Sequence, residues 1–169
     1  LAAKADDVPH PVEFHVSPFE TFQWRGSFDW VLFQESFQYF EDPRATIERA
    51  AKALRYGGRL HIGDQFLHVD VPRAQGRFHF LPRVLQAAKD LGFELHTSCD
   101  VSRAAYRMTG RCLEILRERA AEWTAAHSAR RPEIGKDIAD MLNCGTLEYD
   151  AWRAGYLSYQ LLTFDKVAG

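Results

Sequence analysis

The sequence has little charge imbalance, few cysteines and no long apolar run. Its formal net charge of -2 comes from 21 basic and 23 acidic residues that are interspersed, which disfavours nucleic acid or an anionic membrane surface as the main partner. Cys99, Cys112 and Cys144 are odd in number and far apart, so they fit neither a disulfide framework nor a zinc site and favour a reducing compartment. No apolar stretch approaches the roughly 20 residues that span a bilayer. We therefore expect a cytoplasmic protein that acts on a small molecule, without a metal, nucleic acid or membrane span.

What the chain does contain is enough for one globular unit, because 46% of its 169 residues are hydrophobic. The first residue is Leu1 and not Met, so we expect an upstream segment to be missing. The alternation of apolar and polar side chains from Val12 to Val16 predicts a strand. The nearly continuous apolar run Phe28–Phe33 predicts another strand, of the kind buried on both faces of a parallel sheet.

Helices and strands alternate over the next part of the chain. Asp42 and Pro43 form an N-cap and first helical position, and apolar residues recur at helical spacing up to Leu54. Gly57 and Gly58 should stop this helix before a strand over residues 59–63. A loop over residues 70–76, an amphipathic helix over residues 81–91 and a strand over residues 93–99 follow. Strands joined by helices predict a parallel α/β sheet with right-handed crossovers.

The pattern changes after Ser102, where a long amphipathic helix with a charged outer face is predicted. Pro132 should open a further helix, which Gly145 should end. Gly155 then introduces a last strand over residues 156–167, rich in aromatic and branched side chains.

Two segments carry a resemblance to a known family. Residues 28–36 (FDWVLFQES) and, after a helix, residues 53–60 (ALRYGGRL) resemble the run from strand four to strand five of class I S-adenosylmethionine (SAM) dependent methyltransferases, where the pattern is FDxVxxxES and then LKPGG-RL. Residues 92–95 (GFEL), followed by 100–102 (DVS) and an Arg-rich helix, look like the sixth strand and substrate cap of the lipid and natural-product branch. That branch includes tocopherol, sterol and macrocycle methyltransferases.

The resemblance implies a fold and an activity. The fold is the second half of a doubly wound, Rossmann-like methyltransferase sheet, with an antiparallel last strand and a helical substrate cap. Residues 1–101 and 155–169 would form the second half of the core, and residues 102–154 the cap. The implied reaction is methyl transfer from SAM to a small, fairly apolar acceptor in natural-product biosynthesis, which leaves S-adenosyl-L-homocysteine as product.

The chain departs from the family pattern at the parts that hold the cofactor. No GxGxG-type loop is present, and Ser17 and Pro18 stand where the family often has an Asp-Ala pair after strand three. SAM should therefore be held mostly by residues outside this sequence. In the family order, strand four pairs with strand one, so residues 30–33 would form an unpaired apolar edge. We expect an upstream segment, another subunit or a swapped copy of the chain to complete the sheet.

Candidate site residues follow from the rule that ligands bind beyond the carboxyl ends of parallel strands. Glu35 matches the acidic residue of the family's ES pair, and either contacts acceptor or the methionine end of the cofactor, or caps a loop. Asp64, at the end of the next strand, is either a base or a cap. Positions predicted to bind the cofactor are Ser17, Pro18, Phe19 and Gln34, and those predicted to bind the acceptor are Gln38, Tyr39, Gln65 and Phe66.

Two alternatives stay open at this point. Gln38 and Tyr39 occupy positions where relatives frequently carry Glu-His or His-His, and neither an amide nor a phenol is an effective base at neutral pH. The chain is thus either part of a methyltransferase or a non-catalytic, methyltransferase-like subunit that dimerises with and regulates an active partner. Another doubly wound enzyme, such as a dehydrogenase, ranks last because no acidic ribose-binding residue follows a glycine-rich loop.

Overall fold

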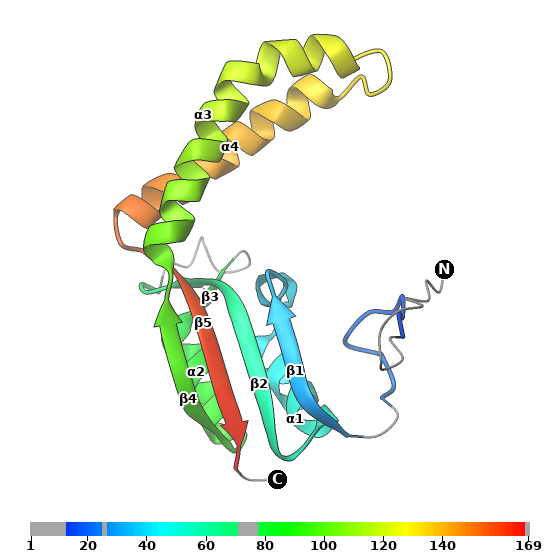
Figure 1. The fold of residues 1–169 in the computed structure, drawn as a ribbon, viewed down its shortest axis with the longest axis vertical. Helices are drawn as coiled ribbons and strands as arrows, with labels where there is room; N and C mark the ends of the chain where they lie inside the picture. Colours follow the sequence, from blue (N-terminus) through cyan, green and yellow to red (C-terminus); the bar gives the residue numbers. More distant parts are fainter. Residues whose placement is uncertain (1–12, 25–26, 71–77, 168–169) are drawn as a thin grey trace, which may run out of the picture.

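The computed structural model describes residues 13–24, 27–70 and 78–167. Its centre is one sheet with the strand order β1-β2-β5-β4, in which a short strand, β3, also pairs with the end of β2. Two helices, α1 and α2, lie behind this sheet, and two long helices, α3 and α4, project from one end of it (Figure 1). The elements are β1 (Phe28–Gln34), α1 (Pro43–Ala53), β2 (Leu54–Leu67), β3 (His79–Phe80), α2 (Leu81–Asp90), β4 (Phe93–Asp100), α3 (Ser102–His127), α4 (Ile134–Arg153) and β5 (Leu157–Lys166).

The two short helices begin and end where local chemistry places them. The Asp42 carboxylate accepts hydrogen bonds from the backbone N–H groups of Arg44 and Ala45, at 2.8 and 3.2 Å, which confirms the predicted cap of α1. Gly92 follows α2 with a φ of 80°, a left-handed conformation that glycine adopts without strain. α1 ends at Ala53 and leads directly into β2, so Gly57 and Gly58 lie inside this strand and do not stop the helix as expected.

The sheet is mixed, because its last strand runs against its neighbours. β1 and β2 are parallel, whereas β5 is antiparallel to both β2 and β4. The antiparallel last strand is thus confirmed. β2 and β4 run parallel to each other, as the alternation of strands and helices predicts, but they are not neighbours, because β5 lies between them.

The main core fills the space between the sheet and the helices α1 and α2. Its fully buried members include Phe37, Ile47, Ile62, Phe66 and Phe164. A second, smaller cluster surrounds Trp152 and Tyr159, near the base of the long helices. Burial at about 25 cal/mol per Å² of apolar surface makes the first cluster the dominant source of stability.

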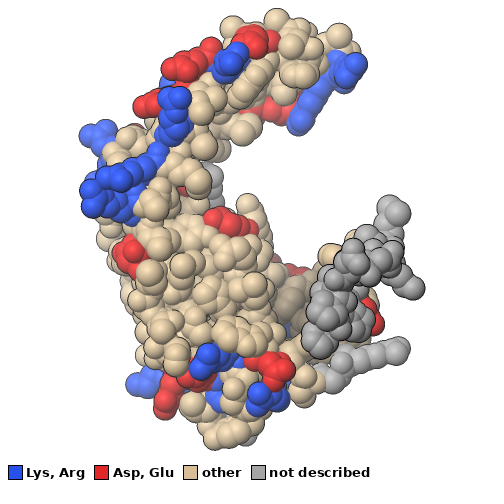
Figure 2. Space-filling model, in the orientation of Figure 1, with Lys and Arg blue, Asp and Glu red and all other residues tan. Residues whose placement is uncertain are grey.

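The opposite face of the sheet has no helix over it among the described elements (Figure 1). Along β1, Val31 and Phe33 pack into the main core, so the alternating residues Trp30, Leu32 and Gln34 point to this other face. Figure 2 shows the same face as a broad surface with few charged side chains.

Strand β1 is also an edge of the sheet, since within the described chain its only partner is β2. Its apolar side chains Phe28, Trp30 and Leu32 are 42%, 53% and 62% exposed. The predicted apolar edge is therefore present. Natural edge strands are usually short, charged or covered, because an open apolar edge invites pairing with another chain.

Helices α3 and α4 form an antiparallel hairpin. The rings of Tyr106 and Tyr149 stack with centroids 4.7 Å apart, and their hydroxyl groups are joined by a 2.8 Å hydrogen bond. The prediction that Gly145 ends α4 is wrong. Gly145 lies inside the helix, where a Cβ atom would come within 2.7 Å of Leu113 Cδ2, so the glycine permits close packing of the two helices. Within the described chain, no helix has the length and apolar character needed to cross a bilayer.

One predicted strand is wrong. Residues 13–16 have no strand partner, and Phe14 and Val16 are 57% and 96% exposed, so alternation alone did not make a strand here. Val12 lies outside the described residues, as does the predicted loop over residues 70–76 except for Asp70.

Candidate functional site

The carboxyl end of β1 leads into a sharp turn of the chain beside β2. β2 continues past this point to Leu67, so Asp64 and Gln65 lie within the strand and not, as the sequence predicted, beyond its end. Gln34 is paired with Gly63 across the two strands, and the Glu35 N–H donates a 2.9 Å hydrogen bond to the Gly63 carbonyl. Glu35 has a φ of 52°, which makes it the one non-glycine residue with a positive φ within the described ranges. Such a backbone costs of order 1–3 kcal/mol and persists only when its surroundings fix it, typically at functional sites. The Glu35 side chain is exposed.

Asp64 fixes the segment that follows this turn. Its side chain is fully buried, and its two oxygens accept hydrogen bonds from the N–H groups of Gln38 (3.0 Å) and Gln65 (2.8 Å). Burial raises the pKa of Asp64, against the lowering effect of these hydrogen bonds. Of the two roles considered for Asp64, this geometry favours the cap over the base.

His79 holds the same segment from the side of β3. Its Nε2 atom is 3.1 Å from the carbonyl oxygen of Phe37, the buried first residue of the single-turn 3-10 helix Phe37–Tyr39. Burial lowers the pKa of His79, although the Phe37 carbonyl and the Asp64 charge oppose this effect. The imidazole is therefore neutral at pH 7 and serves as a hydrogen-bond donor through Nε2.

Tyr159 is a member of this group that the sequence reasoning missed. It lies in β5, opposite Gln65 of β2, and its hydroxyl accepts a 2.8 Å hydrogen bond from Gln34 Nε2. Residues 34 and 159 are far apart in sequence, so nothing in the local pattern links them. The available signal was the family's antiparallel last strand, which brings β5 beside β2.

The predicted cofactor-binding residues divide into two groups. Gln34 lies at the site, next to Glu35 and Tyr159. Phe19 is half-buried in an aromatic cluster, and its ring centroid is 5.2 Å from the ring centroids of both Phe33 and Phe40. Ser17 and Pro18, which come directly before Phe19 in the chain, are exposed. Their contact with a cofactor stays a prediction.

The predicted acceptor-binding residues also differ from one another. Tyr39 is 80% exposed, and Gln38 and Gln65 are half-buried. The Gln65 Oε1 atom is buried and has no hydrogen-bond partner among the described residues. Phe66 has no exposed surface and packs in the main core, which gives it a structural role in this conformation.

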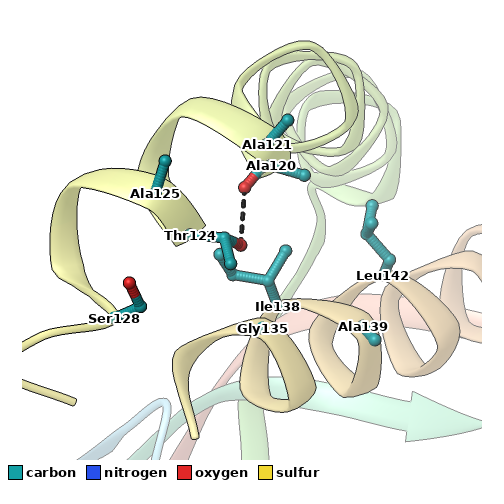
Figure 3. Close-up of a pocket in the computed structure, with 9 residues that line it drawn as sticks. All are labelled: Ala120, Ala121, Thr124, Ala125, Ser128, Gly135, Ile138, Ala139 and Leu142. Atoms are coloured by element: carbon teal, nitrogen blue, oxygen red, sulfur yellow. Dashed lines mark hydrogen bonds between the residues drawn. The ribbon is translucent and has the colours of Figure 1, made fainter. Parts of the chain in front are cut away.

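A groove at the far end of the hairpin is a poorer candidate. Figure 3 shows it between α3 and α4, with Thr124 Oγ1 donating a hydrogen bond to the Ala120 carbonyl and no titratable side chain in its wall. Proton transfer or charge recognition needs such groups. The residues that line the groove are Ala120, Ala121, Thr124, Ala125, Ser128, Gly135, Ile138, Ala139 and Leu142. We therefore place the candidate site at the Gln34–Glu35 turn.

Comparison with known proteins supports the resemblance noted in the sequence. Residues 1–62 match the family model of a methyltransferase domain. A search of curated protein sequences found no match.

Solved structures with the same fold come from several enzymes. The cyclopropane synthase MmaA2 from Mycobacterium tuberculosis aligns with a TM-score of 0.78 at 18% identity, covering 96% of this chain and 63% of its own. The (4+2) cyclase SpnF aligns at 0.70 and 21% identity, covering 95% and 58%. The Haemonchus contortus phospholethanolamine N-methyltransferase 2, solved with phosphomonomethylethanolamine and S-adenosylhomocysteine, aligns at 0.70 and 13% identity, covering 90% and 37%.

At these identities the structural similarity establishes the fold, which is that of the class I methyltransferases, and this confirms the fold expected from the resemblance. The chain spans about 63% of the cyclopropane synthase and 58% of the cyclase. Since a cyclase and an N-methyltransferase share the fold, the reaction has to be argued from the site.

Proposed function

We propose that this chain, whose fold is that of the class I SAM-dependent methyltransferases, forms the later part of such an enzyme and acts on a small, fairly apolar acceptor. The observation that carries the proposal is the exposed Glu35 carboxylate on a strained turn at the carboxyl end of β1. Ligands of open α/β sheets bind at this edge.

The residues present fit SAM in part. SAM supplies a methyl group on a positively charged sulfur, and its methionine end carries an ammonium group. Glu35 would bind that cationic end, because it is the exposed carboxylate of the turn, while Gln34 lies at the end of β1 and Gln65 lies within β2, two residues beyond the Gly63 partner of Gln34. Asp64 is too deeply buried to assist. The chain offers no glycine-rich turn for the rest of the cofactor.

A second body of structure would complete this site. It would add a parallel strand to the β1 edge and cover the bare face that carries Trp30 and Leu32. The source is an upstream segment of the same protein, a second chain or another copy. The hairpin of α3 and α4, which projects from the same end of the sheet as the Glu35 turn, would then act as the acceptor cap (Figure 1).

One observation favours a non-catalytic, partner-regulating subunit as the second candidate. Of the acids and bases that the structure describes at the turn, Asp64 and His79 are occupied in holding backbone groups, which leaves Glu35 for chemistry. Methyl transfer depends mainly on alignment of the reacting atoms, however, and acceptors that need no strong base leave the first candidate in place.

Calorimetry with SAM and with S-adenosyl-L-homocysteine tests the proposal. We expect binding when the chain is combined with the segment or subunit that completes its sheet, and we expect no binding by the chain alone. In that assembly, Glu35→Gln should weaken SAM binding about tenfold, because it removes a charge-assisted hydrogen bond to the cationic end of SAM.

Glu41→Gln is the matched control, since Glu41 is an exposed carboxylate just beyond the turn. It should leave the SAM affinity unchanged. Absence of SAM binding in every assembly would support the non-catalytic subunit, and equal SAM affinities of the Glu35 variant and the unmodified protein would remove Glu35 from the site.

A further inference from the structure

The Gln34 side chain at the end of β1 rests on Gly63 of β2. The two residues are paired across the parallel strands, at the bare face of the sheet. A Cβ atom at position 63 would lie 2.5 Å from Gln34 Oε1 and 3.0 Å from both Cδ and Nε2 of the same amide. The first distance is too short for atoms that are not bonded. The Gln34 amide therefore fills the space that any side chain at position 63 would need.

Tyr159 holds this amide from β5. Tyr159 lies opposite Gln65, two residues beyond Gly63 along β2, and so on the same face of the sheet. Its hydroxyl accepts a 2.8 Å hydrogen bond from Gln34 Nε2 and donates to the Gly63 carbonyl oxygen at 3.3 Å. One hydroxyl, on a side chain that is only 8% exposed, is thus bonded to both members of the Gln34–Gly63 pair.

The position of Tyr159 is itself fixed by the base of the helical hairpin. Its N–H donates to Ser102 Oγ at 3.0 Å, and its carbonyl accepts a 3.0 Å hydrogen bond from the N–H of Val101. Trp152, near the end of α4, belongs to the same buried cluster. Gln34, by contrast, is an exposed residue with a flexible side chain. The hydroxyl is therefore the fixed partner, and the amide is the group that is oriented.

The directions of these hydrogen bonds decide which atom of the amide is left for a ligand. A phenol titrates near about 10, so the hydroxyl keeps its single hydrogen at neutral pH. That hydrogen goes to the Gly63 carbonyl, so Gln34 has to turn its donor, Nε2, toward the hydroxyl. Within the described chain no hydrogen bond engages Gln34 Oε1. An amide oxygen accepts hydrogen bonds, and the ammonium group of SAM is a strong donor.

We propose that Tyr159 is a positioning residue, which holds the Gln34 amide over Gly63 so that Oε1 accepts a hydrogen bond from the ammonium group of SAM. The inference rests on the proposed function, and it adds a second group beside Glu35 for the cationic end of the cofactor. Tyr159 acts through Gln34 and does not contact SAM, because its own side chain is buried.

The contact is tested by NMR without any ligand, in the assembly that completes the sheet. Tyr159→Phe should move the signals of the Gln34 side-chain NH2 group. The signals of Gln86, which donates to Asp90 on α2 behind the sheet, should stay in place. Unmoved Gln34 signals overturn the proposal, whether or not the assembly binds SAM.

Gly63→Ala is a second way to displace the amide. The added Cβ meets the far end of the Gln34 side chain, which can swing away, so the variant should fold and move the same NMR signals. Gly135→Ala is the matched control, since its Cβ would meet Thr124 Cγ2 at an ordinary 3.4 Å in the hairpin. Unmoved Gln34 signals in the Gly63 variant would also overturn the proposed placement of the amide.

The positioning role is tested by double-mutant cycles on the SAM affinity, measured by calorimetry. Tyr159→Phe and Gly63→Ala should each weaken SAM binding about fivefold, and neither should weaken it further in the Gln34→Ala background, because both act through one amide. Tyr56→Phe, at a side chain that is 72% exposed at the other end of β2, should leave the affinity unchanged. An equal loss in both backgrounds, or no loss in either, overturns the positioning role.

A charged variant tests which atom of the amide meets the cofactor. Gln34→Glu keeps an acceptor oxygen and removes the donor, and the Tyr159 hydroxyl can donate to the carboxylate. SAM should bind this variant at least as tightly as it binds the unmodified protein, whereas Gln34→Ala should weaken binding about tenfold. A loss in Gln34→Glu as large as that in Gln34→Ala overturns the role of Oε1 as acceptor.

Failure of the proposed function gives a different result. If no assembly binds SAM, the proposed activity is wrong and the role of Oε1 toward SAM falls with it, while NMR still decides whether Tyr159 holds Gln34. If SAM binds and the cycles are additive, the proposed activity stands and the assignment of Tyr159 falls.

Discussion

Glu35 carries backbone strain that a glycine would relieve. Its φ of 52° lies in the left-handed region, which glycine adopts readily and a residue with a Cβ does not. We expect Glu35→Gly to raise the free energy of unfolding by about 0.5–1 kcal/mol and to abolish the contribution of Glu35 to SAM binding. Urea unfolding and calorimetry measure the two effects.

Glu41→Gly is the control for this substitution, because Glu41 does not have a positive φ and glycine should lower stability there. A loss of stability in both variants would show that the Glu35 backbone is not strained, and the turn would lose its strongest mark of function.

The residues at the strand ends could be predicted from sequence only in part. Gln34 and Glu35 were placed correctly at the carboxyl end of β1, because the end of an apolar run marks the end of a buried strand. The sequence predicted Asp64 and Phe66 as site residues, but it could not predict that both are fully buried. Their burial depends on packing against η1 (Phe37–Tyr39) and α2. Tyr159 could not be found, since its contact with Gln34 exists only after β5 has been inserted beside β2.

At the scale of elements, the 3-10 turn η1 is held to the sheet by two titratable side chains, the fully buried Asp64 and the half-buried His79. His79 donates to the Phe37 carbonyl, and burial lowers the pKa of His79 below the 6.5 expected in the unfolded chain. The unfolded state therefore binds more protons than the folded state below that pH, so His79 costs stability as the pH falls. His79→Gln keeps an N–H donor but does not titrate.

We expect the free energy of unfolding of the unmodified protein, relative to His79→Gln, to decrease between pH 7.5 and pH 5, as the pH passes below about 6.5. Urea unfolding at the two pH values measures this difference. Parallel pH profiles of the two proteins would contradict the assignment of His79 as a half-buried, neutral donor. Asp64 does not confound the comparison, because it is present in both.

Two predictions about helices and strands were wrong because the structure there depends on contacts with other parts of the chain. Residues 13–16 alternate in polarity as a strand does, yet a strand needs a partner, and none is present beside them among the described residues. Gly145 resembled a helix stop, but its effect is set by Leu113 on the opposite helix. The caps at Asp42 and Gly92 were predictable because the interactions that define them are local.

At the scale of the whole molecule, strand order came from the family resemblance and not from periodicity, which cannot specify that β5 separates β2 from β4. The resemblance also placed β1 at an edge, and the exposed Phe28, Trp30 and Leu32 now mark that edge and the bare face beside it. A surface of this kind is stable in water only when it is covered.

We therefore expect the isolated chain to self-associate through β1, and Leu32→Lys, on a side chain that is 62% exposed, to shift it toward monomer. A lysine on an edge strand opposes pairing because its charge would have to be desolvated. Sedimentation velocity measures the shift. Val16→Lys is the matched control, since it adds the same charge at a site that is 96% exposed and outside the sheet. A monomeric unmodified chain, or an equal shift in both variants, would show that β1 is not the surface through which the protein is completed.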